Sequence, residues 1–302
     1  MKIAIHGLGR MGMQIAHKLA ESEHEVIAHN RSPEPIEQAA GYGAVPATTK
    51  TAVLEAFGDT QVVLWMMLPA EVVDGEVAEW LKLLPQGSII IDGGNSDFRL
   101  TKKLNKVIQS AGCQLIDVGT SGGVWGYQNG FSMMAGGDDL AAFQAVEPAL
   151  KTLALPEGAY HYFGPSGSGH FVKMTHNAIE YGMMEAIAEG YNALKTGPYT
   201  GLDLAAAGEV WQHHSVVTSW LNELARDALR ENPDLTGIDG FVAETGEARW
   251  TLETAKQLNI PMPSIQAAFD VRVASGRGEV NFATKLLAAI RNKFGGHKLN
   301  KS

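Results

Sequence analysis

The chain has 302 residues, of which 45% are hydrophobic and 19% are charged, a composition typical of a soluble globular protein with room for two domains. Its formal net charge of −9 argues against non-specific binding to nucleic acid, although a locally cationic pocket could still receive an anionic substrate. The N-terminus MKIAIHG lacks the pattern of a signal peptide, and the most apolar run, 62–68, is too short to cross a membrane, so we expect a cytoplasmic protein without a membrane partner.

The first half of the chain alternates short apolar strands with helical patterns. This alternation requires crossover connections, which predict a mostly parallel, doubly wound sheet covered on both faces. The single cysteine, Cys113, falls in one expected strand, where a buried structural thiol is favoured over a reactive one. The expected strands are 2–7, 25–30, 61–67, 88–94, 113–118, 131–137 and 159–164, and the expected helices are 11–22, 33–40, 49–57, 71–84, 98–111 and 139–153.

After Gly164-Pro165 the pattern changes to long helical segments, expected at 168–195, 203–212, 218–231, 240–258, 264–275 and 281–293. The glycine-rich segment 164–169 leads into the first of them, and it fits either a loop that a ligand approaches closely or a plain linker. The sequence therefore predicts an α/β N-terminal Rossmann-type doubly wound domain over residues 1–164, followed by an all-α C-terminal domain over residues 165–302.

A G-x-G-x-x-G motif, Gly7-Leu8-Gly9-Arg10-Met11-Gly12, separates the first strand from the first helix. In this context Gly7 permits the tight turn, Gly9 lets the backbone approach a pyrophosphate, and Gly12 allows close packing of helix on strand. The N-terminus of the helix then favours the anionic phosphates. The motif predicts a dinucleotide site, with a glycine turn that binds no nucleotide as the less favoured alternative.

The end of the second strand indicates which dinucleotide binds. An acidic residue there would bind the ribose 2′-hydroxyl of NAD, but this chain has Asn30-Arg31-Ser32. Arg31 can bind or stack on a 2′-phosphate and Ser32 can donate to it, which favours NADP and leaves acceptance of NAD open. The alternative is an exposed loop arginine without a ligand.

Asn95 follows the strand at 88–94, at the carboxyl edge where doubly wound sheets bind ligands. It offers a donor and an acceptor to cofactor or substrate, whereas Ser96 and Asp97 can equally well cap the next helix. We expect no metal site, because His213 and His214 are adjacent in the sequence and would point apart on a helix.

Lys173, His176, Asn177, Glu180 and Tyr181 share one stripe of the helix expected at 168–195, because their spacing follows the helical repeat. The flanks of this stripe are largely apolar, which favours burial, and buried polar groups need partners that a bound polar substrate can supply. The alternative is a solvated helix face with a lysine and a glutamate two turns apart.

Five sequence blocks carry a family resemblance. The chain resembles the short form of the decarboxylating 6-phosphogluconate dehydrogenases over essentially its whole length. The wider β-hydroxyacid dehydrogenases typically lack HNxIEYG. The blocks are GLGRMG at 7–12, DGGNS at 92–96, SGGVWG at 121–126, GHFVKMTHNAIEYG at 169–182 and RNKFGGH at 291–297, in the order found in the family.

The resemblance implies oxidative decarboxylation of 6-phospho-D-gluconate to D-ribulose 5-phosphate and CO₂, with reduction of NADP or NAD. It implies that Lys173 is the general base for the C3 hydroxyl and that Glu180 is the acid that protonates the enediol. It further implies substrate contacts from Ser121, Gly122, Gly123, His176 and Asn177, and a phosphate contact from Tyr181.

The resemblance also implies cationic phosphate contacts. Arg272 matches the family's phosphate-binding arginine, with Arg277 as a nearby competitor. Arg291 and His297 match a C-terminal pair that reaches the phosphate site of a neighbouring subunit, which implies a homodimer or a dimer of dimers with a shared site. The alternative for RNKFGGH is a basic helix end.

The chain departs from the longer relatives at 245–250, where TGEARW replaces a lysine-rich segment. Thr245 stands where the family has a phosphate-binding lysine, and Arg249 is a candidate substitute. Two rival functions remain: a non-decarboxylating dehydrogenase of a small acid such as 3-hydroxyisobutyrate, and a non-catalytic NADP-binding sensor.

Overall fold

The computed structural model describes residues 1–299, so the last three residues of the predicted helical domain lie outside the described residues. The chain divides into two compact units, Met1–Met174 and Thr175–Ser302. The division falls inside the long helix α8 (Ser168–Thr196), and the boundary expected near Gly164 stays a prediction. In the described part of the chain, none of the helices is both long and apolar enough to cross a membrane.

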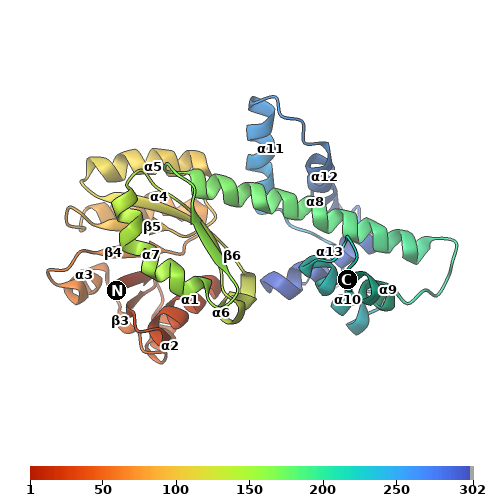
Figure 1. The fold of residues 1–302 in the computed structure, drawn as a ribbon, viewed down its shortest axis with the longest axis horizontal. Coiled ribbons are helices and arrows are strands. Elements are labelled where there is room, and N and C mark those ends of the chain that lie inside the picture. Colours follow the sequence, from red (N-terminus) through yellow and green to blue (C-terminus); the bar gives the residue numbers. More distant parts are fainter. Residues whose placement is uncertain (300–302) are drawn as a thin grey trace. The chain divides into compact units, whose positions relative to one another are not determined.

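Within the described residues, the first unit contains one sheet of eight strands, in the order β3-β2-β1-β4-β5-β6-β7-β8. Figure 1 shows part of this sheet between its helices. Neighbouring strands are parallel except β6 and β7. This confirms the predicted doubly wound fold. The sequence pattern missed β3, because this short edge strand contains Pro46. The strands are β1 (Lys2–His6), β2 (Glu25–His29), β3 (Val45–Ala47), β4 (Val63–Met66), β5 (Ile89–Asp92), β6 (Gln114–Ser121), β7 (Ser132–Gly136) and β8 (Ala159–Tyr162).

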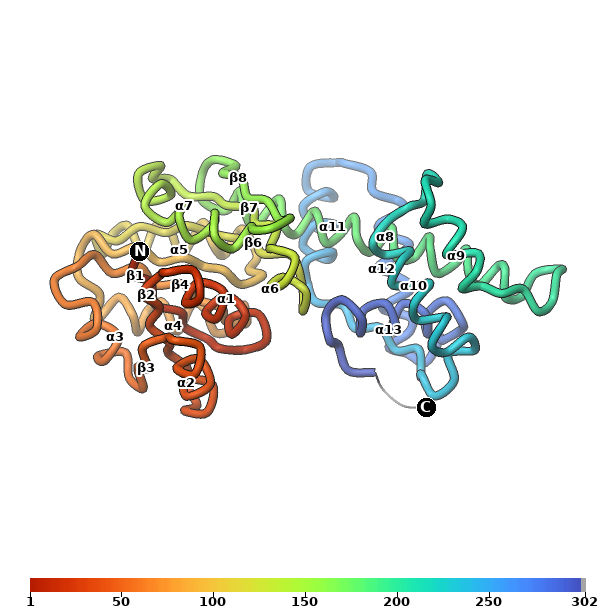
Figure 2. Tube along the Cα trace, turned by 60° about the horizontal axis from the view of Figure 1, so that its bottom comes forward, coloured from red at the N-terminus to blue at the C-terminus, as the bar shows by residue number. Residues whose placement is uncertain are grey.

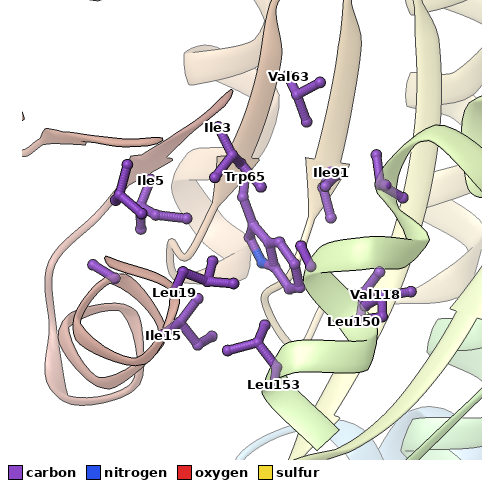
Figure 3. Packing of buried hydrophobic residues seen from close by; sticks show 14 of the residues in the cluster. Ile3, Ile5, Ile15, Leu19, Val63, Trp65, Ile91, Val118, Leu150 and Leu153 are labelled. Atoms are coloured by element: carbon purple, nitrogen blue, oxygen red, sulfur yellow. The ribbon is translucent and has the colours of Figure 1, made fainter. Parts of the chain in front are cut away.

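Alternate residues of the central strands enter two apolar cores, one on each face of the sheet. Helices α1 (Arg10–Glu21), α2 (Pro33–Ala40) and α7 (Leu140–Ala154) cover one face, where Trp65 packs among Ile15, Leu19 and Leu153 (Figure 3). Helices α3 (Lys50–Phe57), α4 (Ala70–Leu81) and α5 (Phe98–Ser110) cover the other. Cys113 is buried beside this second core, as expected.

The described part of the second unit is all helical, as predicted (Figure 2). Its main core packs Tyr191 of α8 against Leu224 and Leu287. After α8 come α9 (Leu204–Gln212), α10 (Trp220–Glu231), α11 (Glu247–Gln257), α12 (Pro263–Ser275) and α13 (Phe282–Gly295).

The helix expected at 240–258 is wrong over its first turns, because α11 begins at Glu247. Gly240 and Gly246 have φ angles of 86° and 100°, which a right-handed helix cannot contain. The Val242 N–H instead donates to the Ser275 hydroxyl at 3.0 Å. The segment before α11 is therefore an ordered loop that delivers Glu247 at the start of a helix.

Candidate active site

The turn formed by the glycine motif is closely packed at Gly7 and Gly12 and open at Gly9. A Cβ on Gly7 would lie 2.5 Å from the Met67 carbonyl oxygen, and one on Gly12 would lie 1.9 Å from the Gly7 carbonyl oxygen. Around Gly9, in contrast, a Cβ would meet no described atom within 4 Å. Gly9 is also the N-cap of α1 and makes no side-chain cap there. The first turn of α1 can therefore receive phosphate oxygens on its backbone N–H groups.

Asn30 braces this turn. Its Oδ1 accepts from the Leu8 N–H at 3.0 Å, and its Nδ2 donates to the Ser32 carbonyl at 3.3 Å. Ser32 is the N-cap of α2 but its hydroxyl makes no cap hydrogen bond, and Arg31 beside it is exposed. Of the three residues expected at this end of β2, Asn30 thus shapes the loop, whereas Arg31 and Ser32 can face a ligand.

Asn95 lies exposed on the loop after β5, while its neighbours have structural partners. The Ser96 hydroxyl donates to Asp92 Oδ2 at 2.8 Å, and Asp97 caps α5 by accepting from the Arg99 N–H at 2.8 Å. The capping alternative therefore holds for Asp97, and the role expected of Asn95 in binding a ligand stays a prediction.

The loop after β6 contains the SGG sequence. Ser121 ends the strand, and Gly122 and Gly123 follow with φ angles of 140° and 54°. A Cβ on Gly122 would lie 3.1 Å from the Phe131 ring. The chain then makes the short helices η1 (Gly123–Trp125) and α6 (Gly126–Asn129), which the sequence pattern did not predict.

A groove of about 600 Å³ lies beside this loop within the first unit. Leu8, Gly9 and Arg10 form one side of it, and Val124, Trp125 and Tyr127 form another. The glycine motif and the loop after β6, which the sequence associates with cofactor and substrate, therefore share one concave surface.

Lys173 belongs to the first unit and is 5% exposed. It lies against Gly119 of β6, where an added Cβ would come within 2.2 Å of the Lys173 Cβ. Asp117 of the same strand fixes the start of α8, because its carboxylate accepts from the Gly167 N–H at 2.7 Å and from the His170 N–H at 2.9 Å. The segment 164–169 is thus packed on the sheet, and Lys173 is held at a defined place on β6.

The second unit holds the rest of the polar stripe of α8. The Asn177 amide donates to Glu247 Oε1 at 3.0 Å, and Asn177 Oδ1 contacts His176 Nδ1 at 2.9 Å. Glu247 is 3% exposed and opens α11 directly after Gly246. The arrangement gives Asn177 a defined orientation, which a solvated helix face would lack.

Tyr181 is 3% exposed and lies between α11 and α12 of the second unit. Its hydroxyl accepts from the Thr245 N–H at 3.2 Å, so the residue that replaces the family's lysine contacts Tyr181 through its backbone. The Arg272 guanidinium carbon lies 3.2 Å from the centre of the Tyr181 ring. Arg272 is 3% exposed, whereas its competitor Arg277 is exposed.

Arg291 brings a second buried guanidinium to the same side chains. Burial lowers the pKa of Arg291, while Tyr181, Glu180 and Glu247 oppose that shift. Burial also lowers the pKa of Arg272 to about 10, with Tyr181 opposing and the charge of Arg291 adding to the shift. Two buried cations that repel each other make a site suited to an anion.

The other expected cations lie elsewhere. Arg249 is an exposed partner of Glu244. His297 is half-buried, with its ring 6.2 Å from that of Phe294, and its carbonyl accepts from the Asn292 amide at 2.8 Å. Within residues 1–299, no group of three or more histidine, cysteine, aspartate or glutamate side chains is placed to hold a metal ion.

Several residues that shape these sites were missed from the sequence. Asp117 and Gly119 lie in β6, where the sequence pattern indicated only an apolar strand. Glu247 lies in the departure at 245–250, where the sequence led us to expect a cationic phosphate contact and not a buried acid. Glu185, one turn beyond Tyr181, is 7% exposed, and burial raises its pKa to about 7. Its position on the buried side of α8 could have identified Glu185 from the sequence.

Comparison with known proteins connects this geometry to a family. Residues 2–164 match the model of the NAD binding domain of 6-phosphogluconate dehydrogenase, and residues 169–301 match that of the 6-phosphogluconate dehydrogenase C-terminal domain. The chain belongs to the 6-phosphogluconate dehydrogenase family. Its first unit therefore carries the NAD-binding domain of that family.

Two full-length relatives of the 6-phosphogluconate dehydrogenase family are about as long as this chain. One, from Bacillus subtilis, is named a putative 6-phosphogluconate dehydrogenase and is 36% identical over 100% of both chains. The other, from Haloferax volcanii, is named an NAD(+)-dependent, decarboxylating 6-phosphogluconate dehydrogenase and is 35% identical over 99% of this chain and 98% of its own.

A solved structure of the same family supports the fold. The 6-phosphogluconate dehydrogenase of Plasmodium falciparum, described without ligand, with NADP+ and with 6-phosphogluconate, has a TM-score of 0.80 and 25% identity. The match covers 96% of this chain and 70% of that longer chain.

Proposed function

We propose that the protein catalyses the oxidative decarboxylation of 6-phospho-D-gluconate to D-ribulose 5-phosphate and CO₂, with NADP or NAD as hydride acceptor. The buried pair Arg272 and Arg291 beside Tyr181 is the observation that carries the proposal. A phosphate dianion would offset the repulsion between the two guanidinium groups and accept hydrogen bonds from both. Family membership makes 6-phosphogluconate the phosphorylated acid that fits.

In this proposal α8 supplies both proton-transfer groups. Lys173 takes the proton from the C3 hydroxyl while the hydride leaves C3. The resulting β-keto acid loses its carboxylate as CO₂, and the electron pair moves onto the C3 oxygen, to which Lys173 returns the proton. Glu180 then protonates the carbon that becomes C1 of ribulose 5-phosphate. His176 and Asn177 orient the hydroxyl and carboxylate groups.

The first unit fits a dinucleotide. The space above Gly9 admits a pyrophosphate, and the first turn of α1 supplies backbone donors for it. When bound there, the nicotinamide accepts the hydride. Asn95, Ser121, Gly122 and Gly123 are proposed to hold the substrate beside it.

Arg31 and Ser32 favour NADP over NAD. Arg31 is exposed at the end of β2, and the Ser32 hydroxyl is not used as a cap for α2. Arg31 can therefore bind a 2′-phosphate from its exposed position, and the Ser32 hydroxyl can donate to it without losing a cap hydrogen bond. A steady-state comparison of kcat/KM for NADP and NAD tests this preference.

We also propose a homodimer in which the C-terminal segment of one subunit completes the site of the other. Arg291 already interacts electrostatically with Tyr181 of its own chain. The proposed contact between subunits therefore concerns mainly His297. A dimer of dimers would preserve the same shared contact.

The direct test of the proposed function is an assay with 6-phosphogluconate that follows reduced nucleotide and CO₂ together. We expect both, in equal amounts. A dehydrogenase of small acids would reduce the nucleotide without releasing CO₂, and it would have no phosphate for Arg272 and Arg291. A nucleotide-binding sensor would bind NADP without turnover.

A further inference from the structure

A polar stripe on α1 contacts a neighbouring loop of the first unit. Gln14, His17, Lys18 and Glu21 follow the i, i+3, i+4, i+7 spacing of one helix face. On a surface helix such a face is ordinarily solvated. Here all four side chains contact the segment 123–127, which directly follows the SGG sequence.

Gln14 bonds this segment through both ends of its amide. Its Nε2 donates to the Gly123 carbonyl at 3.4 Å and to the Arg10 carbonyl at 3.1 Å. Its Oε1 accepts from the Tyr127 N–H at 3.1 Å. The side chain thus uses two donors and an acceptor, a combination that neither a carboxylate nor an alkyl group can reproduce.

Lys18 bonds the same segment one turn later. Its ammonium group donates to the Tyr127 carbonyl at 2.9 Å, to the Gly126 carbonyl at 3.4 Å and to the Leu155 carbonyl. An ammonium has three N–H donors, and here backbone oxygens accept from all of them. Burial lowers the pKa of Lys18.

Tyr127 adds contacts along the rest of the stripe. Its ring stacks on His17 with centroids 4.5 Å apart, and His17 stacks in turn on Tyr42, in the turn after α2, at 3.7 Å. Its hydroxyl donates to Glu21 at 2.5 Å. The segment is therefore fastened to α1 along two full turns of the helix.

The loop needs such contacts because its own backbone is permissive. Gly122 and Gly123 both have positive φ angles, and glycine loses more conformational entropy on ordering than other residues. Hydrogen bonds that begin at Gly123 and continue to Tyr127 select one conformation of this loop. The same helix begins at the dinucleotide turn, so one rigid element determines both.

We infer that Gln14 and Lys18 are positioning residues: they hold the substrate loop 121–127 on α1, and thereby tie its shape to the helix whose N-terminus receives the dinucleotide. The identity of the substrate rests on the proposed function, whereas the contacts themselves do not. Neither residue touches the reacting atoms in this proposal.

Hydrogen exchange tests the contacts without any substrate. In Gln14→Leu, the Tyr127 amide loses its acceptor, and we expect it to exchange at least ~10-fold faster than in the wild type. Gln14→Glu keeps the acceptor but loses the donors, so Tyr127 should stay protected. Gln38→Leu is the control, because Gln38 is exposed on α2 and donates to Tyr42. Unchanged exchange in Gln14→Leu would overturn the inference, whatever the substrate.

Steady-state kinetics then separate positioning from general stability. We expect Gln14→Leu and Lys18→Met to raise the KM for 6-phosphogluconate ~10-fold, with kcat within about threefold and the Kd for NADP within about twofold of the wild type. A parallel loss of nucleotide affinity would show a general structural role and contradict the inference. If the wild type does not oxidise 6-phosphogluconate, the proposed function fails, while hydrogen exchange still decides whether the loop is held.

Discussion

The central carbon of the Arg272 guanidinium lies 3.2 Å from the centre of the Tyr181 ring. Tyr181 is fixed in turn, because its hydroxyl accepts from the Thr245 N–H. A planar, delocalised cation stacks on a ring in a way that an ammonium cannot match. The stacking therefore presents the N–H groups of Arg272 in a fixed orientation, which suits a phosphate.

Arg272→Met should raise the KM for 6-phosphogluconate by about 30-fold to 5000-fold, the range expected when one partner of a buried, charged hydrogen bond is removed. The Kd for NADP, measured by fluorescence titration, should stay within about twofold. Arg277→Met is the matched control, since Arg277 is exposed just beyond the same helix. Equal effects of the two variants would remove Arg272 from the phosphate site.

Lys173→Met should lower kcat by about three orders of magnitude, the middle of the range for loss of a general base. Nucleotide binding should persist, because the dinucleotide is proposed to bind at the glycine turn and the first turn of α1, and not through Lys173. Lys103→Met, an exposed lysine on α5, serves as the control. Turnover at the wild-type rate in Lys173→Met would exclude Lys173 as the base.

Glu185→Gln should change how stability depends on pH. Burial, with a contribution from Glu189, raises the pKa of Glu185 to about 7, and Arg272 opposes that shift. An acid whose pKa is higher in the folded state binds more protons there, so its ionisation destabilises the fold as pH rises from about 4.5 to 7. Across this pH range the free energy of unfolding of the variant should therefore increase relative to that of the wild type, by about 3 kcal/mol at most.

Urea denaturation at pH 5, 6, 7 and 8 measures this difference. Glu55→Gln is the control, because Glu55 lies exposed on α3 in the first unit and does not contribute to the pKa of Glu185. Parallel stability curves for the wild type and Glu185→Gln would show that Glu185 is not held in its neutral form.

Mixing of two impaired variants, assayed at a low concentration of 6-phosphogluconate, tests the shared site. If His297 serves the partner subunit, Lys173→Met and His297→Ala chains should form hybrid dimers that contain one intact site. Activity after mixing should therefore exceed the mean of the two homodimers. His297→Ala alone should raise the KM for 6-phosphogluconate. An unchanged KM, or mixing without any gain, would contradict the shared-site proposal.

Much of the fold follows from the sequence because apolar periodicity and glycine position are local signals. The β–α alternation of the first unit and the helical second unit were predicted in this way. The role of Asn30 was harder to predict, because the same residue type can contact a ribose or stabilise a turn. Its hydrogen bond to the Leu8 N–H shows the second role, and the cofactor contact stays a prediction. The false helix over 240–246 arose because nothing local predicts that both of its glycines have positive φ angles.

The candidate site shows the same limit. The stripe from Lys173 to Tyr181 is visible in the sequence because its members share a helix. Arg272 was proposed through the family resemblance, and its place against Tyr181 depends on packing between α8 and α12. Gln14 and Lys18 looked like ordinary residues of a surface helix, since their partners are backbone carbonyls more than one hundred residues away.

The central claim is that oxidation of 6-phosphogluconate is coupled to loss of its carboxylate. The most direct test uses 6-phosphogluconate labelled with ¹³C at C1 and follows the reaction by NMR with NADP in excess. We predict that the label appears entirely as CO₂ and bicarbonate, in an amount equal to the NADPH formed. Formation of NADPH with the label retained in an organic acid would contradict the account.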